Sequence, residues 1–426
     1  MREINIGILG GGTVGGGTVR VLLSNAELLA ARVGARLCVR RVVVRDLGKP
    51  RPDIPHALLS ADPADVLDDP AIEIVAELIG GVEPARGFVL RALAAGKNVV
   101  TANKEMVAKH GPELRAAAQA AGKDFLFEAS VAGGIPVVAA LSESLAGNHV
   151  REIVGIVNGT TNFILTKMTA EGAGFEKVLA EAQSLGYAEA EPSADVDGHD
   201  ARYKIAILAS LAFGTRVDVA NVHAEGIRHV SPRDIAVARD LGCRIKLVAV
   251  AQAAHNGIRV RVYPALLPLA HPLATVDGVF NAVLIRGDMV GDITLVGRGA
   301  GGLPTGSAVA GDLVSVARNI IAETTGRIAY AKPSDLPLLP ATSAWSKFYA
   351  RVRVLDRPKA LAAIAGLFGD YDVSLETVIQ HAMPDAEAEI VWVTHEARER
   401  DVLAALEAIR ALPVVRSVDN VLRVVG

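Results

Sequence analysis

The chain has 426 residues, of which 51% are hydrophobic, 21% charged and 4% aromatic, and its formal net charge is -3. This balance is typical of a folded protein of two or three domains and excludes an intrinsically disordered chain. Such a charge provides no basic field for a phosphate backbone, so we expect no nucleic-acid partner. Two cysteines, Cys38 and Cys243, are too few for a disulfide scaffold and favour a reducing compartment.

The sequence has no pattern typical of export or of membrane insertion. The start, MREINIGILGGG, places two charges before a short apolar run that ends in glycine, unlike a secretory signal. The apolar run IAILASLAFG is far shorter than the roughly 18 residues that a membrane span needs. We therefore expect a cytoplasmic protein with no membrane partner.

The first 130 residues alternate strand patterns with Ala- and Leu-rich helical patterns. Short β-branched runs predict strands at 4–9, 37–44, 72–78, 98–102 and 124–129. This alternation indicates an α/β domain with a doubly wound, Rossmann-type parallel sheet. We assign residues 1–130 to a dinucleotide-binding domain, completed by about 297–330, where a second glycine-rich turn precedes a helix.

The remaining segments predict two further domains. Residues 131–296 contain strands and helices that suit an α+β catalytic and dimerisation domain. A proline-rich stretch at 331–346 reads as a linker. Residues 347–426 follow the order βαββαβ, which is the ferredoxin-like arrangement.

A glycine motif directly follows the first predicted strand. Gly10, Gly12 and Gly15 form GxGxxG, in which the first glycine allows a tight turn, the second admits a pyrophosphate and the third lets the helix pack on the sheet. Thr13 and Val14 lie between them at the helix start and are expected to contact the same cofactor. A tight turn without a ligand is the alternative, but the βαβ context favours a dinucleotide. The absence of a following lysine excludes a Walker P-loop.

Arg45, at the predicted tip of the second strand, bears on the choice of nucleotide. An acid there holds the ribose 2′-hydroxyl of NAD, whereas an arginine accommodates the 2′-phosphate of NADP. Arg45, with Lys49 or Arg51, favours NADP. Under the alternative, Arg45 is a solvated charge and Asp46 binds the ribose.

A lysine, Lys104, follows the fourth predicted strand. It lies just past the strand's C-terminal end, where open α/β sheets bind ligands, although an exposed lysine without a role also fits.

The segment GYAEAEPSADVDGHDARYK (186–204) contains five carboxylates before an apolar helix. Asp200 and Lys204 are four residues apart and form either a helix-supporting ion pair or a site where a partly desolvated lysine transfers a proton.

Several blocks together resemble the homoserine dehydrogenase family. They are GYAEAEPSADVDGHDARYK, TANKEMVA (101–108), EASVAGGIPV (128–137), VNGTTNFIL (157–165) and GAGGLPTGSAV (299–309). The resemblance covers essentially the whole chain, including a C-terminal ACT domain. It implies the NAD(P)H-dependent interconversion of L-aspartate 4-semialdehyde and L-homoserine, on the route to threonine, methionine and isoleucine.

The resemblance also implies roles for individual residues. Lys204 corresponds to the family's proton donor. The substrate-binding positions fall on Glu189, Asp195, Asp200 and Lys104, and the cofactor lies near Lys104, Gly186 and Gly301. The family binds a monovalent cation, usually Na⁺, and those positions are Glu128, Val131, Gly133 and Ile135. A homo-oligomer, either dimer or tetramer, is expected.

Two rival functions share parts of this pattern. A 2-hydroxyacid dehydrogenase such as phosphoglycerate dehydrogenase also joins a nucleotide domain to an ACT domain, but its glycine motif normally lies mid-chain, whereas here it starts at Gly10. A non-catalytic amino-acid sensor has no reason to keep both Lys104 and Lys204.

The ACT segment departs from its family at one turn. Where a D-x-x-G turn is usual, this chain has Asp356 followed by Lys359, so a side chain stands where glycine lets an effector approach. The alternative is that the ammonium group of Lys359 holds an effector carboxylate. We expect the domain mainly to strengthen self-association, and a chain ending at Thr342 to keep its activity with weaker oligomerisation. Threonine is expected to inhibit only weakly.

Overall fold

The computed structural model describes residues 1–326 and 335–425, so part of the predicted linker lies outside them. The chain divides into two compact units, which we describe separately. The first comprises Met1–Ile153, Tyr203–Asn221 and Phe280–Leu336, and the second Val154–Arg202, Val222–Val279 and Pro337–Gly426. Strand β7 (Val150–Ile156) and helix α10 (His199–Ala212) run from one unit into the other. Within the described residues, no helix combines the length and apolar character that a membrane crossing requires.

A parallel sheet with the order β3-β2-β1-β4-β5-β6 forms the centre of the first unit. Its strands are β1 (Glu3–Leu9), β2 (Arg36–Val43), β3 (Leu59–Ser60), β4 (Ile74–Glu77), β5 (Asn98–Thr101) and β6 (Phe125–Leu126). The doubly wound, Rossmann-type fold is confirmed. The sequence pattern did not reveal β3, because two residues carry no periodicity.

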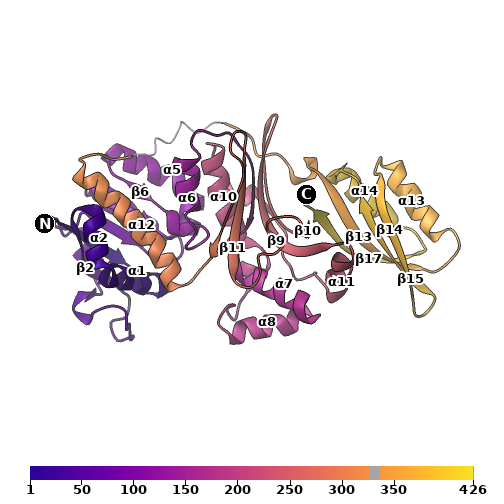
Figure 1. The fold of residues 1–426 in the computed structure, drawn as a ribbon, viewed down its shortest axis with the longest axis horizontal. Coiled ribbons are helices and arrows are strands. Elements are labelled where there is room, and N and C mark those ends of the chain that lie inside the picture. Colours follow the sequence, from indigo (N-terminus) through magenta and orange to yellow (C-terminus); the bar gives the residue numbers. More distant parts are fainter. Residues whose placement is uncertain (327–334, 426) are drawn as a thin grey trace. The chain divides into compact units, whose positions relative to one another are not determined.

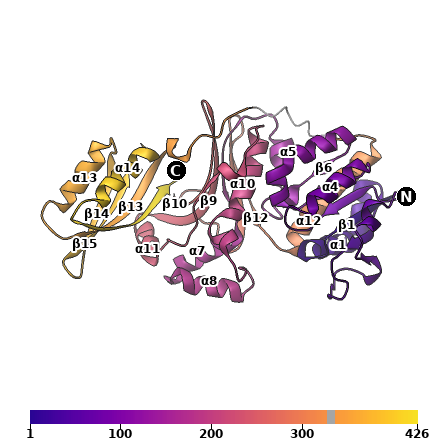
Figure 2. The same cartoon turned by 180° about the vertical axis from the view of Figure 1, so that it is seen from behind.

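Helices cover both faces of this sheet. They are α1 (Thr13–Ser24), α2 (Ala26–Val33), α3 (Ala64–Leu67), α4 (Ala85–Ala94), α5 (Lys104–Ala121) and α12 (Gly302–Ile321), and the short α6 (Val137–Ala139) belongs to the same unit. Figure 1 shows α1, α2 and α12 on one face, where Ile4, Ile6 and Ile8 of β1 are fully buried. Figure 2 shows α4 and α5 from behind, on the opposite face. A hairpin of β11 (Phe280–Gly287) and β12 (Gly291–Arg298) also belongs to this unit.

Three glycines bring α1 and α12 into direct backbone contact. A Cβ added at Gly17 would lie 2.0 Å from the carbonyl oxygen of Gly302, and one added at Gly306 would lie 2.6 Å from the backbone of Gly17 and Thr18. Neither backbone can yield without moving its helix. The late glycine-rich segment therefore packs α12 against the helix that follows the GxGxxG turn.

The second unit contains a mixed sheet in which the strands run β9-β10-β17-β13-β15-β14. They are β9 (Cys243–Ala254), β10 (Gly257–Pro268), β13 (Trp345–Leu355), β14 (Leu375–Met383), β15 (Glu387–Thr394) and β17 (Val415–Val424), with short β8 (His223–Ala224) and β16 (Ala397–Arg398) beside them. The helices are α7 (Gly159–Glu171), α8 (Phe175–Ser184), α9 (Ser193–Val196), α11 (Pro232–Asp240), α13 (Ala360–Asp370) and α14 (Glu399–Arg410).

The C-terminal segment has the ferredoxin-like order that its sequence predicts, and its sheet continues that of the preceding segment. Strand β17 pairs antiparallel with β13 and parallel with β10, where Ala265 and Leu266 face Arg423 and Val424. Lys359 has φ 73°, the left-handed conformation that favours glycine, so the turn keeps the shape of the D-x-x-G pattern without its glycine.

We predict that Gly306→Ala destabilises the protein, because its Cβ overlaps the backbone of α1, and overpacking costs about 1–3 kcal/mol. Gly311 is the matched control on the same helix, since nothing lies within 4 Å of its added Cβ. Gly311→Ala should stabilise by up to about 1 kcal/mol through helix propensity. Thermal and urea unfolding of both variants check this, and equal midpoints contradict the proposed backbone contact.

Candidate active site

The GxGxxG turn borders a large cavity in the first unit. The cavity has a volume of about 1050 Å³ and is lined by the turn, by the residues after β2 and by the start of α12. Gly10 has φ +108°, and a Cβ at Gly15 would lie 2.0 Å from the carbonyl oxygen of Gly10. A Cβ at Gly12 would meet nothing within 4 Å. Gly10 thus allows the tight turn, Gly12 leaves room for a ligand to approach, and Gly15 allows close packing of the helix. This combination fits a dinucleotide.

The first turn of α1 is suited to phosphate binding. Thr13 and Val14 begin the helix, its N-cap is Gly12 without a capping side chain, and the first turn contains no acid. Amide groups and the helix dipole at such an end favour an anion.

The basic residues that follow β2 differ in how they are held. The strand ends at Val43, two residues before Arg45, which is exposed and lines the cavity with Lys49. Arg51 instead donates to the backbone carbonyls of Gly11 (3.1 Å), Asp46 and Lys49 (both 2.8 Å). Among these cations, Arg45 and Lys49 remain the candidates for a 2′-phosphate.

A buried carboxylate supports the start of α5, where Lys104 stands. Glu77 is fully buried at the end of β4 and accepts hydrogen bonds from the amide of Ile79 (2.7 Å) and the hydroxyl of Thr101 (2.6 Å). Burial raises its pKa. Asn103 caps α5 and donates to the carbonyl of Gly81 (2.6 Å). Sequence reasoning missed Glu77, although an acid within a buried strand is itself a signal.

Two of the predicted acids come together in the second unit. The side-chain amide of Asn158 donates to Asp195 (2.7 Å) and to Asp200 (2.9 Å), so both carboxylates lie beside one nitrogen. Asn158 also caps α7, since its side-chain oxygen Oδ1 accepts from the backbone amide of Thr161 (2.9 Å). Asp200 is 5% exposed. Asn158 lies within the block VNGTTNFIL, but no local pattern in the sequence marks it as a site residue.

Other predicted residues lie in exposed loops or at helix ends. Glu189 is exposed between α8 and α9, and its backbone carbonyl accepts from Gln183 (3.0 Å). Gly186 has φ +74°, and Gly301, the N-cap of α12, has φ +113°. Both glycines therefore occupy conformations that other residues rarely adopt.

Lys204 stands one turn after Asp200 on α10, as the spacing predicted. It is 9% exposed. An ammonium group so placed acts in a medium of low polarity, where its charge has a stronger effect than in water.

The residues of the predicted cation site lie around a tight turn in the first unit. Both carboxylate oxygens of Glu128 accept backbone amides, from Val138 (2.8 Å) and Ala139 (2.7 Å), and burial raises its pKa. Val131 and Ile135 are buried, and Gly133 between them has φ +59°. Residues 1–326 and 335–425 contain no cluster of three His, Cys, Asp or Glu side chains placed to hold a metal ion.

Comparisons with known proteins identify the family. The model of the homoserine dehydrogenase NAD-binding domain matches residues 10–128, that of homoserine dehydrogenase matches 136–314 and that of the ACT domain matches 348–414. The homoserine dehydrogenase of Synechocystis sp. is 46% identical, covering 99% of this chain and 100% of that protein. That of Corynebacterium glutamicum is 44% identical, covering 99% and 95%.

A solved structure agrees with these matches. The crystal structure of a homoserine dehydrogenase from Thiobacillus denitrificans covers 100% of this chain and 99% of that one, with a TM-score of 0.96 at 44% identity. Such identity over the full length, together with the confirmed Rossmann-type and ACT folds, shows that the chain belongs to the homoserine dehydrogenase family of NAD(P)-dependent oxidoreductases.

Proposed function

We propose that Lys204 is the proton donor when this homoserine dehydrogenase reduces L-aspartate 4-semialdehyde to L-homoserine. The nicotinamide nucleotide, when bound, supplies the hydride. Negative charge then develops on the aldehyde oxygen, and a poorly solvated ammonium group both stabilises that charge and delivers a proton. The low exposure of Lys204 supports this role.

The acids of the second unit bind the amino-acid part of the substrate in this proposal. The carrying observation is the pair of hydrogen bonds from Asn158 to Asp195 and Asp200. Two adjacent carboxylates repel each other, so a substrate ammonium group beside them is favourable. Glu189 adds a further acceptor, and Lys104 suits the substrate carboxylate. Positive charge on the substrate explains why the sequence concentrates acids in this segment.

For the cofactor, the proposal is NADP rather than NAD. Support comes from Arg45 and Lys49, which line the cavity where a 2′-phosphate lies in related folds. Asp46, the alternative ribose ligand, accepts the amide of Gly48 (2.8 Å) with its side chain. Gly186 and Gly301 are proposed to lie near the bound nucleotide.

A monovalent cation, Na⁺, is proposed at Glu128, Val131, Gly133 and Ile135. Carboxylate and carbonyl oxygens are the donors that hard cations prefer. The left-handed turn at Gly133 supports a bend around such an ion. The protein is further proposed to act in the cytoplasm as a homodimer or tetramer.

Lys204→Ala should lower kcat about 10²- to 10⁴-fold, the usual loss for a general acid, while NADPH binding stays unchanged. Lys204→Arg keeps the charge but supplies a group that does not release its proton, so it should remain impaired. Homoserine oxidation at 340 nm and NADPH fluorescence titration measure the two effects. The exposed Lys177→Ala serves as the control, and a kcat for Lys204→Ala within threefold of the parent rejects the assignment.

Asn158→Asp should raise KM for homoserine at least about tenfold, since it removes the donor that holds Asp195 and Asp200 in place and adds a carboxylate that repels both of them from their positions; about 1.4 kcal/mol corresponds to tenfold. Aspartate is also a good N-cap, so α7 should remain folded. The measurement compares KM for homoserine with KM for NADP and with the unfolding midpoint. An unchanged KM for homoserine means that Asn158 does not organise the substrate acids.

Arg45→Asp should shift the preference from NADP towards NAD, because an acid repels the 2′-phosphate and accepts the 2′-hydroxyl. The readout is the ratio of kcat/KM for NADP to that for NAD. Arg41→Asp makes the same charge change on an exposed residue of β2 and should leave the ratio unchanged. Equal ratios in the Arg45 variant and the parent make Arg45 an ordinary surface charge.

A further inference from the structure

The segment of residues 223–234, which runs from β8 to the start of α11, lies against helix α9, which contains Asp195, and against the turn that follows it. The amide of Ile227 donates to the carbonyl of Val196 (2.9 Å). A Cβ added at Gly226 would lie 2.2 Å from that same oxygen and 2.6 Å from the Cα of Asp197. The backbone of Gly226 therefore packs directly against the backbone of Val196 and Asp197.

An ion pair reinforces the same contact. Arg228 donates to both carboxylate oxygens of Asp197 (2.6 and 3.1 Å) and to the hydroxyl of Ser193 (3.1 Å). Ser193 belongs to α9, which contains Asp195, and Asp197 lies in the turn before α10, whose first turn contains Asp200. The position of segment 223–234 thus helps to fix α9 and the turn from which α10 starts.

The ACT domain holds the first end of this segment. Arg423 of β17 donates from two nitrogens to the two carboxylate oxygens of Glu225, each at 2.8 Å. Arg423 also pairs with Glu399 of α14, which accepts from Arg261 of β10 as well (2.8 Å). The guanidinium groups of Arg261 and Arg423 both lie within 5 Å of the Tyr263 ring centre, at 4.9 and 4.8 Å. The side chain of Arg423 is therefore buried, whereas that of Glu225 is partly exposed.

Charge keeps this contact formed over a wide pH range. Burial alone raises the pKa of Glu225, but hydrogen bonds from His223 and Arg423 outweigh it and lower the pKa to about 2. The carboxylate is therefore ionised at neutral pH and remains so well into the acid range.

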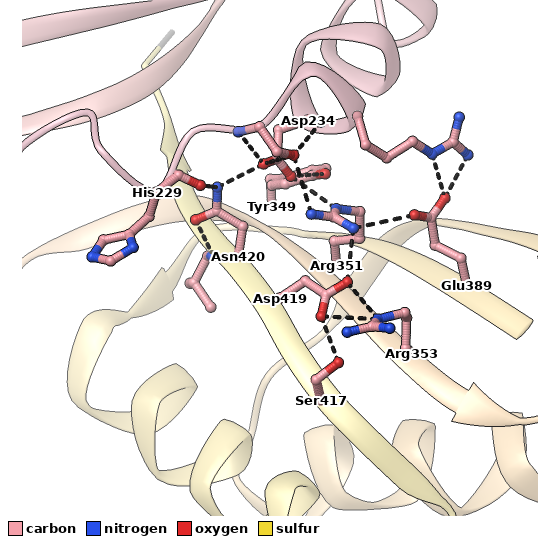
Figure 3. Close-up of polar contacts among 12 residues, drawn as sticks. His229, Asp234, Tyr349, Arg351, Arg353, Glu389, Ser417, Asp419 and Asn420 are labelled. Atoms are coloured by element: carbon pink, nitrogen blue, oxygen red, sulfur yellow. Dashed lines mark hydrogen bonds and ion pairs between the residues drawn. The ribbon is translucent and has the colours of Figure 1, made fainter. Parts of the chain in front are cut away.

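The ACT domain holds the other end of the segment through Asp234, which is fully buried (Figure 3). Its carboxylate accepts from Arg351 (2.8 Å), Tyr349 (3.1 Å) and Asn420 (2.9 Å), all on ACT strands. Asn420 also donates to the carbonyl of His229 (3.3 Å). Since breaking a buried ion pair leaves an uncompensated charge, both ends are strongly constrained.

We infer that Glu225 and Arg423 are positioning residues: through Gly226, Ile227 and Arg228, the ACT domain fixes α9 and the turn before α10, and with them the positions of Asp195 and Asp200. This inference rests on the role proposed for the two acids. It also changes the expectation for a chain ending at Thr342, which loses every ACT partner of Glu225 and Asp234. Such a chain should bind homoserine poorly rather than keep its activity.

The test uses the full-length enzyme and Glu225→Gln, which keeps the side-chain shape and removes the charge. KM for homoserine should rise about fivefold or more, a loss of about 1 kcal/mol of binding, whereas the Kd for NADPH should stay within twofold. Gly226→Ala, which pushes on Val196 without touching any charge, should give the same split. General destabilisation would instead lower the active fraction, and with it apparent kcat, without changing KM.

The matched control is Glu376→Gln, which removes the ion pair of Glu376 with Lys347 in the ACT domain. The side chain of Glu376 is 38% exposed and that of Glu225 33%. It should leave both constants unchanged. In a double-mutant cycle, Glu225→Gln with Arg423→Met should raise KM no further than the stronger single variant, since the two act through one contact.

Two outcomes distinguish a failure of this inference from a failure of the substrate-binding role proposed for the two acids. If Asn158→Asp raises KM for homoserine but Glu225→Gln and Gly226→Ala do not, the acids bind substrate and the ACT domain does not position them. If none of the three changes KM, the proposed substrate site itself is wrong. Should Glu225→Gln fail to fold, Glu225→Asp, which keeps the charge but shortens the reach, must still raise KM, and an unchanged KM overturns the inference.

Discussion

Two like charges held beside one amide set the main constraint on the second unit. Asp195 and Asp200 both accept from Asn158, and each carboxylate raises the electrostatic cost of the other. Such a pair persists only where the backbone leaves it little freedom to separate. The N-cap of α7 fixes Asn158, and the contacts of Ile227 and Arg228 fix α9, which contains Asp195. In the function proposed above, a substrate ammonium group offsets the cost of the pair.

The first unit meets its ligand mainly with backbone. Gly10, Gly12 and Gly15 shape the cavity border, and Gly17 lets α12 approach α1 closely. Neither feature involves the acids of the second unit. A change confined to the acids of the second unit is therefore expected to alter KM for homoserine more than Kd for NADPH, which is why comparing the two constants distinguishes a positioning effect from a general loss of structure.

Local patterns predicted the strands of the nucleotide domain, the glycine turn and the βαββαβ order, because each depends on residues close in sequence. The end of β2 was predicted two residues late, near Arg45, since strand ends leave no periodic signal. The roles of Asn158, Glu225 and Arg423 were missed for another reason. Their partners are 37, 42 and 198 residues away, so nothing in the neighbouring sequence marks them.

The chemistry of the ACT contacts determines what they can transmit. An apolar interface has few directional contacts, so its two sides can slide. The bidentate interaction of Arg423 with Glu225 and the three ACT-domain donors to Asp234 instead each fix an orientation. Their ends lie on β13 and β17, the two paired strands nearest β10. A ligand of the ACT domain can thus change substrate binding only if it favours a different arrangement of these strands, since an equilibrium shifts only through differential affinity for its states. Regulation and substrate positioning would then share one set of contacts.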